Sequence, residues 1–280
     1  MTIEWCRIYD TGQCRVPERL LVSDGSWRPV SCRALTAVLR HSKHGIILFD
    51  TGVAPRLNQV TARWPGKLYR SVVRFDCRRE LSLVQQLERD GIRARDVRFV
   101  ILSHVHADHL GGLLDFPQAE IVLSEEALAF ACKMRGVKAV LKAFLPELLP
   151  SDFVDRCRPV SRYTHTLHTL RTCDLFDDGT THLVDLPGHS PGHMGMLTGS
   201  NGTKLFFVAD SCWHSRAVTH DKLPHPVTRL IVHNWMAMKS TVRHIQQFLA
   251  GHPEYIMIPS HCPLAAEKYL IDERSHVQAV

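Results

Sequence analysis

The stretch Ser103-His104-Val105-His106-Ala107-Asp108-His109-Leu110-Gly111-Gly112 places three histidines and an aspartate within six residues. It directly follows the apolar run 97–102, which predicts a buried strand. The glycine pair predicts a sharp turn, which would direct the imidazoles and the carboxylate toward one point beyond the strand end. These residue types at this spacing indicate a metal site, and the weaker alternative is a histidine-rich surface loop.

The two halves of this motif can serve two ions. His104 and His106 are two residues apart, so they share a face of an extended backbone. Asp108 and His109 lie beyond the turn and can bind a second ion close by.

Three more predicted strands end in residues of the same kind. His189 comes after the predicted strand 180–186, Asp210 after the strand 204–209 and His261 after the strand 255–258. Glycine and proline on both sides of His189 predict a tight turn. A buried aspartate is costly unless a cation compensates it, so Asp210 is expected to bridge two ions. For His193, four residues after His189, we favour a role in orienting the turn over metal binding.

Other segments are expected to form the scaffold. Strands 33–40 and 45–49 form a hairpin that leads to Asp50, a carboxylate able to orient loops around a metal centre. Helices are expected over 81–91 and 234–250, and a further strand over 119–123. Segment 53–80 is expected to form a long, partly irregular loop near the site mouth, and segment 151–178 is expected to be irregular. The apolar segment 125–150 is either a cap over the site or core, and the sequence leaves both open.

Composition indicates an ordinary globular protein. Of its 280 residues 45% are hydrophobic and 22% charged, and no apolar run has the length of a membrane span. We expect one domain over 1–280, with a cap segment around 125–165.

The first residues lack the apolar core of a secretory signal, so a cytoplasmic location is expected. The nine cysteines form no C-x-x-C pair and are expected to be reduced. The basic residues behind the net charge of +6 are dispersed, so we expect no nucleic-acid partner.

The order of these motifs resembles the metallo-β-lactamase superfamily, from Asp50-Thr51-Gly52 to Ser260-His261. The resemblance implies an α/β fold, a four-layer αββα sandwich with the site at one edge of its two sheets. It also implies two divalent metal ions per chain, zinc being the first expectation and iron, manganese or cobalt the alternatives. One ion would be held by His104, His106 and His189, the other by Asp108, His109 and His261, with Asp210 bridging.

Two ions about 3.5–4 Å apart can share a hydroxide and polarise a scissile carbonyl or phosphoryl oxygen. Asp108 would then be both a ligand and the catalytic residue that carries a proton to the leaving group. An aspartate at 210, where the commonest β-lactamase subclass is expected to have cysteine, argues against antibiotic hydrolysis. Only 19 residues follow His261, which argues against the thioesterases that append a helical region there.

In length and motifs the chain is most similar to the N-acyl homoserine lactonase and pyridoxolactonase group, which implies a quorum-quenching lactonase. The expected substrate is a small ester or lactone. Trp213 stands where those lactonases carry a substrate-binding tyrosine, so it is expected to contact the substrate, although an indole donates at a different distance and angle. A phosphodiesterase or nuclease of the same fold, a low-turnover ligand-binding effector, and a homodimer remain open.

Overall fold

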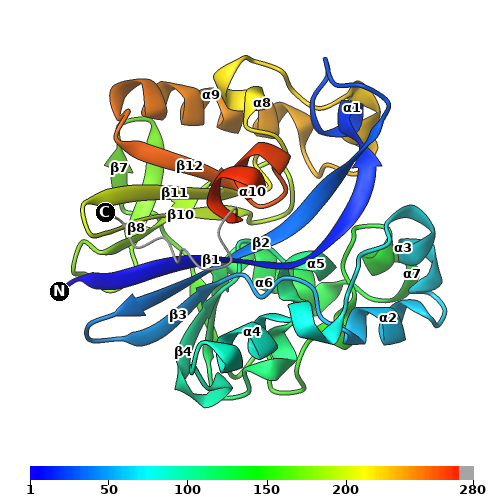
Figure 1. The fold of residues 1–280 in the computed structure, drawn as a ribbon, viewed down its shortest axis with the longest axis horizontal. Helices are drawn as coiled ribbons and strands as arrows, with labels where there is room; N and C mark the ends of the chain where they lie inside the picture. The colour runs from blue at the N-terminus through cyan, green and yellow to red at the C-terminus, as the bar shows by residue number, and fades with distance from the viewer. Residues whose placement is uncertain (271–280) are drawn as a thin grey trace.

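The structure is a computed structural model that describes residues 1–270 (Figure 1). Its strands are β1 (Ile3–Pro17), β2 (Pro29–His41), β3 (Gly45–Phe49), β4 (Val97–Ile101), β5 (Glu120–Ser124), β6 (Cys157–Val160), β7 (His165–Leu167), β8 (Leu170–Asp174), β9 (Thr181–Asp185), β10 (Met194–Ser200), β11 (Thr203–Ala209) and β12 (Tyr255–Pro259). Its α-helices are α1 (Glu18–Leu21), α2 (Arg56–Thr61), α3 (Lys67–Val72), α4 (Leu83–Arg89), α5 (Ala107–Leu110), α6 (Glu125–Lys133), α7 (Gly136–Val140), α8 (Arg216–Thr219), α9 (Trp235–Gly251) and α10 (Pro263–Leu270). Short 3-10 turns lie at Arg79–Leu81, Ala94–Asp96, Leu113–Asp115, Pro146–Leu148 and Pro226–Leu230.

The strands form two halves that meet along one weak seam. The first half runs in the order β6-β5-β4-β3-β2-β1, and the second contains β7 to β10 followed by β11 and β12. A single parallel pair, Ile3 with Ser200, joins β1 to β10. The two halves therefore behave as two sheets, which Figure 1 shows lying one above the other.

Alternation along β3 shows how the layers are built. Ile46 and Leu48 pack into an apolar cluster with the helical segments that cover the first sheet. Ile47 and Phe49 face the other way, into a cluster shared with Met196 and Phe207 of the second sheet. Because successive side chains of a strand point to opposite faces, β3 is buried on both sides.

The second sheet is covered on its outer face by α9. Ile245 and Phe248 of this helix pack with Phe206 and Val208 of β11. With the helices over the first sheet this completes the four layers, and the predicted αββα sandwich is confirmed. In the described residues no helix combines the length and the hydropathy needed to cross a membrane.

The structure has more regular elements than expected in two segments of the scaffold. Segment 53–80, expected to be a partly irregular loop, contains the short helices α2 and α3 between irregular stretches. The prediction for segment 151–178 is wrong, because it contributes β6, β7 and β8. Short strands with polar faces lack the apolar alternation on which the prediction depends.

The apolar segment 125–150 lies mostly inside the protein. Phe144, Leu145 and Leu148 are fully buried in the cluster beneath the first sheet, whereas Leu141 is 66% exposed. These buried side chains favour core over cap for most of the segment. The single-domain boundary expected at 280 falls beyond the described residues.

Candidate metal centre

The predicted ligands meet because of how the strands run. β3 pairs in parallel with β4, and β11 pairs in parallel with β12, so their carboxyl ends lie at one edge of the sandwich. At two of these ends the chain turns through a left-handed backbone, at Asp50 with φ 63° and Ala209 with φ 45°. Non-glycine residues rarely adopt this conformation, and it redirects the following residues out of the sheet.

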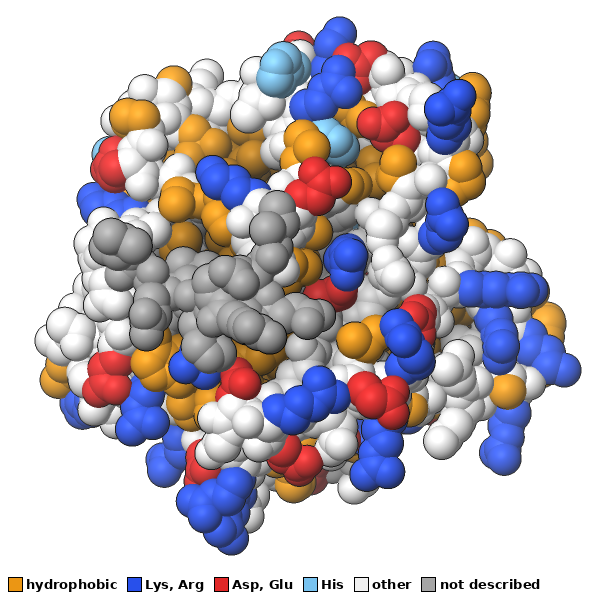
Figure 2. Space-filling model, in the orientation of Figure 1, with side chains coloured by type: hydrophobic (Ala, Val, Ile, Leu, Met, Phe, Trp, Pro, Cys, Tyr) orange, Lys and Arg blue, Asp and Glu red, His pale blue; other side chains and the backbone are white. Residues whose placement is uncertain are grey.

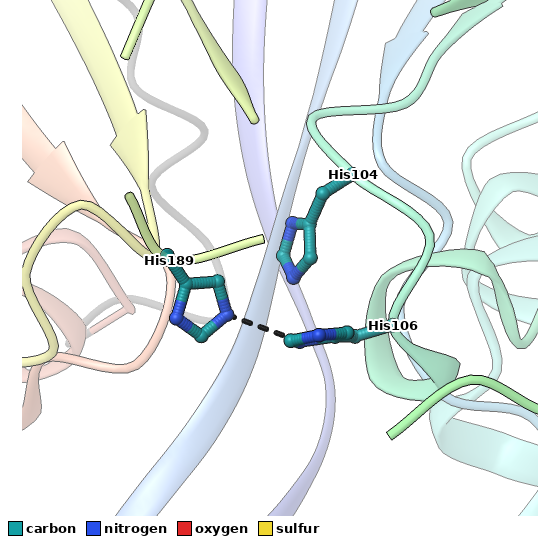
Figure 3. Close-up of side chains that lie close together, drawn as sticks. All are labelled: His104, His106 and His189. Atoms are coloured by element: carbon teal, nitrogen blue, oxygen red, sulfur yellow. Dashed lines mark hydrogen bonds between the residues drawn. The ribbon is translucent and has the colours of Figure 1, made fainter. Parts of the chain in front are cut away.

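The first cluster consists of His104, His106 and His189, which Figure 3 shows converging on one point from loops on opposite sides. His189 Nε2 lies 3.0 Å from His106 Nδ1. The Nε2 atom of His104 is buried and has no hydrogen-bond partner among residues 1–270. The ligand atoms of all three residues lie within 4.8 Å of one another.

The second cluster consists of Asp108, His109 and His261. His261 Nε2 lies 3.2 Å from Asp108 Oδ2 and 3.3 Å from His109 Nε2. Asp108 is the more open end of this group, with a side chain that is 14% exposed against 2% for His109. Asp108 is therefore more accessible to solvent than His109.

Asp210 lies between the two clusters. Its Oδ2 is 3.2 Å from His189 Nε2 in the first cluster. Its Oδ1 is 3.3 Å from His261 Nε2 and 3.4 Å from His109 Nε2 in the second, and no hydrogen-bond donor to this oxygen lies in the described part of the chain. The two oxygens of one buried carboxylate thus face two different sets of nitrogen atoms.

A hydrogen-bond network behind the clusters selects which nitrogen each ring presents. Asp50 Oδ2 accepts from Ser103 Oγ and from His109 Nδ1, each at 2.8 Å. Because the Ser103 hydroxyl donates to Asp50, it accepts the proton of His104 Nδ1 at 2.9 Å. His261 Nδ1 donates to the backbone carbonyl of Arg33. In His104, His109 and His261, Nε2 is therefore the free nitrogen.

This arrangement fits divalent cations. His109 Nε2 and His261 Nε2 lie 3.3 Å apart, and both rings already donate through Nδ1. If both rings are neutral, their lone pairs face each other and two carboxylates, and either a bound cation or a proton on a ring relieves that repulsion. Three imidazoles, or two with a carboxylate, are the donor sets that divalent zinc prefers.

The pKa shifts of the histidines differ between the two clusters. Burial lowers the pKa of His104 and His189 well below the usual value and that of His106 to about 4, which keeps the first cluster neutral. Burial also opposes protonation of His261, but Asp210 and Asp108 outweigh it and raise the pKa to about 9. The second cluster, where the carboxylates gather, attracts a cation most strongly.

Two further residues hold Asp210 in place. His193 Nδ1 donates to the Leu186 carbonyl at 3.0 Å, and its Nε2 accepts the backbone N–H of Asp210 at 3.1 Å. Trp213 Nε1 donates to Asp210 Oδ2 at 3.0 Å. The indole N–H expected to meet a substrate is thus bound to a predicted metal ligand, and Trp213 can contact a substrate only through its ring.

The sequence did not single out Ser103, the Arg33 carbonyl or Tyr69. Ser103 immediately precedes the histidine motif, and its position next to a strand end was the one available signal. The Arg33 contact depends on the backbone and leaves no mark in the sequence. Tyr69 of α3 is buried near the centre, and burial together with the charge of Asp108 raises the pKa of its hydroxyl well above the usual value.

Comparison with known proteins identifies the family. The family model described as the metallo-beta-lactamase superfamily matches residues 32–247. The chain belongs to the metallo-beta-lactamase superfamily. It is a metal-dependent hydrolase of that superfamily, and its grouped histidines and aspartates indicate that it binds divalent metal.

Individual members of the superfamily align along most of the chain. An N-acyl homoserine lactonase, AiiB from Agrobacterium fabrum, is 24% identical over 260 residues, which is 86% of this chain and 87% of the relative. A probable metallo-hydrolase from Mycobacterium tuberculosis is 22% identical over 81% of this chain and 74% of its own length.

Solved structures share the fold at low identity. An N-acyl homoserine lactone hydrolase with bound N-hexanoyl-L-homoserine has a TM-score of 0.75 at 16% identity, covering 96% of this chain and 97% of its own. The dizinc quorum-quenching lactonase AidC has a TM-score of 0.63 at 17% identity, covering 94% of this chain and 90% of its own.

Proposed function

We propose that this chain binds two divalent metal ions, zinc in the first instance, and hydrolyses a small lactone or related carboxylic ester. The observation that carries the proposal is the carboxylate of Asp210, whose two oxygens face different clusters of ligands 3.2 to 3.4 Å away. In that arrangement His104, His106 and His189 hold one ion, and Asp108, His109 and His261 hold the other.

Bound ions of this kind lower the pKa of a water molecule and polarise the carbonyl oxygen that is attacked. The side chains of the protein hold the ligands in position and transfer a proton. Asp50 and Ser103 fix the rings of His104 and His109, while His193 and Trp213 fix the carboxylate of Asp210. Asp108, the more open carboxylate, is placed to accept a proton and pass it to the leaving alkoxide.

An apolar acyl group on the substrate is supported by one loop beside the site. The backbone N–H of His233 donates to the His189 carbonyl at 3.0 Å, which ties this loop to the first cluster. The same loop exposes Leu230 (82%) and Ile231 (56%). Exposed apolar side chains beside a polar centre are typical of a binding surface. Relatives named as N-acyl homoserine lactonases support the same substrate class.

The proposal is tested with lactones of increasing acyl length, measured beside bis(p-nitrophenyl) phosphate. Each added methylene should improve kcat/KM by up to about fourfold, the equivalent of ~0.8 kcal/mol, until the apolar surface is covered. Leu230→Ser should flatten this trend and leave the zinc content unchanged. A flat lactone series together with clear phosphodiester turnover would contradict the lactonase and support a phosphodiesterase.

A further inference from the structure

Two cysteine thiols lie opposite each other on β1 and β2. Cys14 and Cys32 are direct partners in the antiparallel pairing of these strands, which run side by side in Figure 1. Because directly opposite residues point to the same face of a sheet, both side chains enter one apolar cluster. Both residues are buried, and the structure holds both as free thiols.

The backbone holds these two residues at the spacing of a disulfide. The N–H of Glu18 donates to the Arg28 carbonyl at 3.1 Å, in step with the strand pairing, and the register has no shift over residues 13–17 of β1. Hydrogen-bonded and non-hydrogen-bonded pairs alternate along antiparallel strands, so Cys14 and Cys32 are a hydrogen-bonded pair, with Cα atoms about 5.5 Å apart. The Cα atoms of disulfides are usually about 4.4–6.8 Å apart, so a bond between the two sulfurs requires little movement of the backbone.

The two sulfur atoms lie within reach of each other. The Cys32 thiol donates to the Cys14 sulfur, which lowers the pKa of the Cys14 thiol and raises the pKa of the Cys32 thiol well above its usual value. The other cysteine of β1, Cys6, is equally buried but lies opposite Leu39. A single buried cysteine is usually a small apolar side chain, whereas two with adjacent sulfurs have the arrangement of a reduced disulfide.

A small oxidant can reach Cys14. This residue lines a cavity of about 510 Å³ between β1 and the end of α3, together with Val72 and Phe75. A water molecule in the liquid occupies about 30 Å³, so the cavity has room for molecules of the size of hydrogen peroxide. Cys14 is therefore the sulfur that a dissolved peroxide meets first.

We propose that Cys14 and Cys32 are a modification site at which hydrogen peroxide forms a reversible disulfide. The Cys14 sulfur attacks one oxygen of the peroxide, which breaks the O–O bond, releases one water molecule and leaves a sulfenic acid on Cys14. The Cys32 sulfur then attacks the Cys14 sulfur, and the hydroxyl group leaves with the Cys32 proton as a second water molecule. Two electrons pass from the two thiols to the peroxide, and a reductant returns them.

The disulfide would act on the metal centre through two contacts. The carbonyl of Arg33, next to Cys32 in β2, accepts the N–H of His261 Nδ1. Trp213 packs in the same cluster as the two cysteines and donates to Asp210. An S–S bond of about 2.05 Å is shorter than the contact distance of two thiols, so it draws β2 toward β1 beside both contacts. Oxidation should therefore lower the affinity for zinc. This effect rests on the proposed metal centre, whereas the disulfide itself does not.

Peptide mapping of the full-length protein tests the disulfide. After a slight molar excess of hydrogen peroxide and blocking of the remaining thiols, the tryptic peptides that contain Cys14 and Cys32 should be joined, two hydrogen masses lighter than their sum. A phosphine reductant should separate them. Cys6→Ala, matched for strand and burial, should give the same joined peptide, whereas Cys14→Ala and Cys32→Ala should give none. Wild-type protein in which Cys14 stays a thiol or ends as a sulfinic acid, with no joined peptide, would overturn the site, whether or not the variants fold.

Zinc titration tests the effect on the metal centre. Peroxide should lower the zinc affinity of wild type on the order of tenfold, as the loss of contacts that support metal ligands does, and the phosphine should restore it. Cys14→Ala should keep its affinity under the same treatment, which excludes damage to the ligands. A joined peptide with unchanged affinity would refute the effect on the centre. Failure of the reduced wild type to bind two zinc ions would instead contradict the proposed function and leave the disulfide standing.

Discussion

Replacing Trp213 with phenylalanine tests whether the indole holds the carboxylate of Asp210 in place. The N–H donates to Asp210 Oδ2 at 3.0 Å, the same oxygen that lies 3.2 Å from His189 Nε2. A hydrogen bond to a charged group contributes about 1.5–3 kcal/mol, and each 1.4 kcal/mol is a factor of ten. We therefore expect zinc affinity to fall about 10- to 100-fold, the usual effect of losing such a supporting contact.

The substitution leaves most of the packing intact. Trp213 is 7% exposed and packs among Cys32, Val232 and Met238, and phenylalanine fills much of the same space. A competition titration against a chromophoric zinc chelator measures the affinity, and activity should recover when zinc is added in excess. Activity that stays low at saturating zinc would indicate a direct role of the indole in the reaction.

Trp235→Phe is the matched control. Trp235 is partly buried beside the same apolar cluster, and its ring lies 5.1 Å from the Arg229 guanidinium. Its zinc affinity should equal that of wild type. Wild-type affinity in Trp213→Phe would refute the reasoning, since the geometry leaves Asp210 Oδ2 without this donor in that variant.

Two other substitutions test separate parts of the structure. Asp210→Ala should lower the affinity for both ions of the metal centre, whereas His261→Ala should chiefly lower the affinity for one. Zinc titration measures both affinities. Equal loss of both ions in the two variants would contradict the bridging assignment. Gly52→Ala should destabilise the fold by more than about 2 kcal/mol in urea unfolding, because its φ is +63° and a Cβ atom would lie 1.9 Å from Thr11 Oγ1. Gly179→Ala is the comparison, since its φ is +78° and a Cβ atom there meets no atom within 4 Å. Its stability should fall only by the cost of placing alanine in a left-handed backbone conformation.

The ligand positions could be predicted because each follows a strand that its own side chains define. Strands such as β4 and β11 are mostly apolar, with a buried run at the end that leads to the site, and a histidine or aspartate soon after such a run has few structural uses. Burial of Asp210 similarly follows from its place after β11. The prediction failed where strands are short and polar, as in β6 and β7, because their pairing depends on neighbours distant in sequence.

The direction of Trp213 shows a second limit. Its position three residues after Asp210 suggested a substrate contact, but the indole N–H donates to the Asp210 carboxylate. The residue types in 210–213 do not show which acceptor the N–H meets, because that depends on how the chain folds after β11.

The choice of nitrogen in each histidine depends on contacts of the same kind. His104 and His109 present Nε2 because Ser103 and Asp50 engage their Nδ1 atoms, and His261 does so because of the Arg33 carbonyl. None of these partners belongs to the ligand motif. The sequence can therefore predict that imidazoles gather around one point. Which nitrogen of each ring faces a metal depends on the Asp50 carboxylate after β3, the Ser103 hydroxyl after β4 and the Arg33 carbonyl of β2, which the packing of the first sheet brings together.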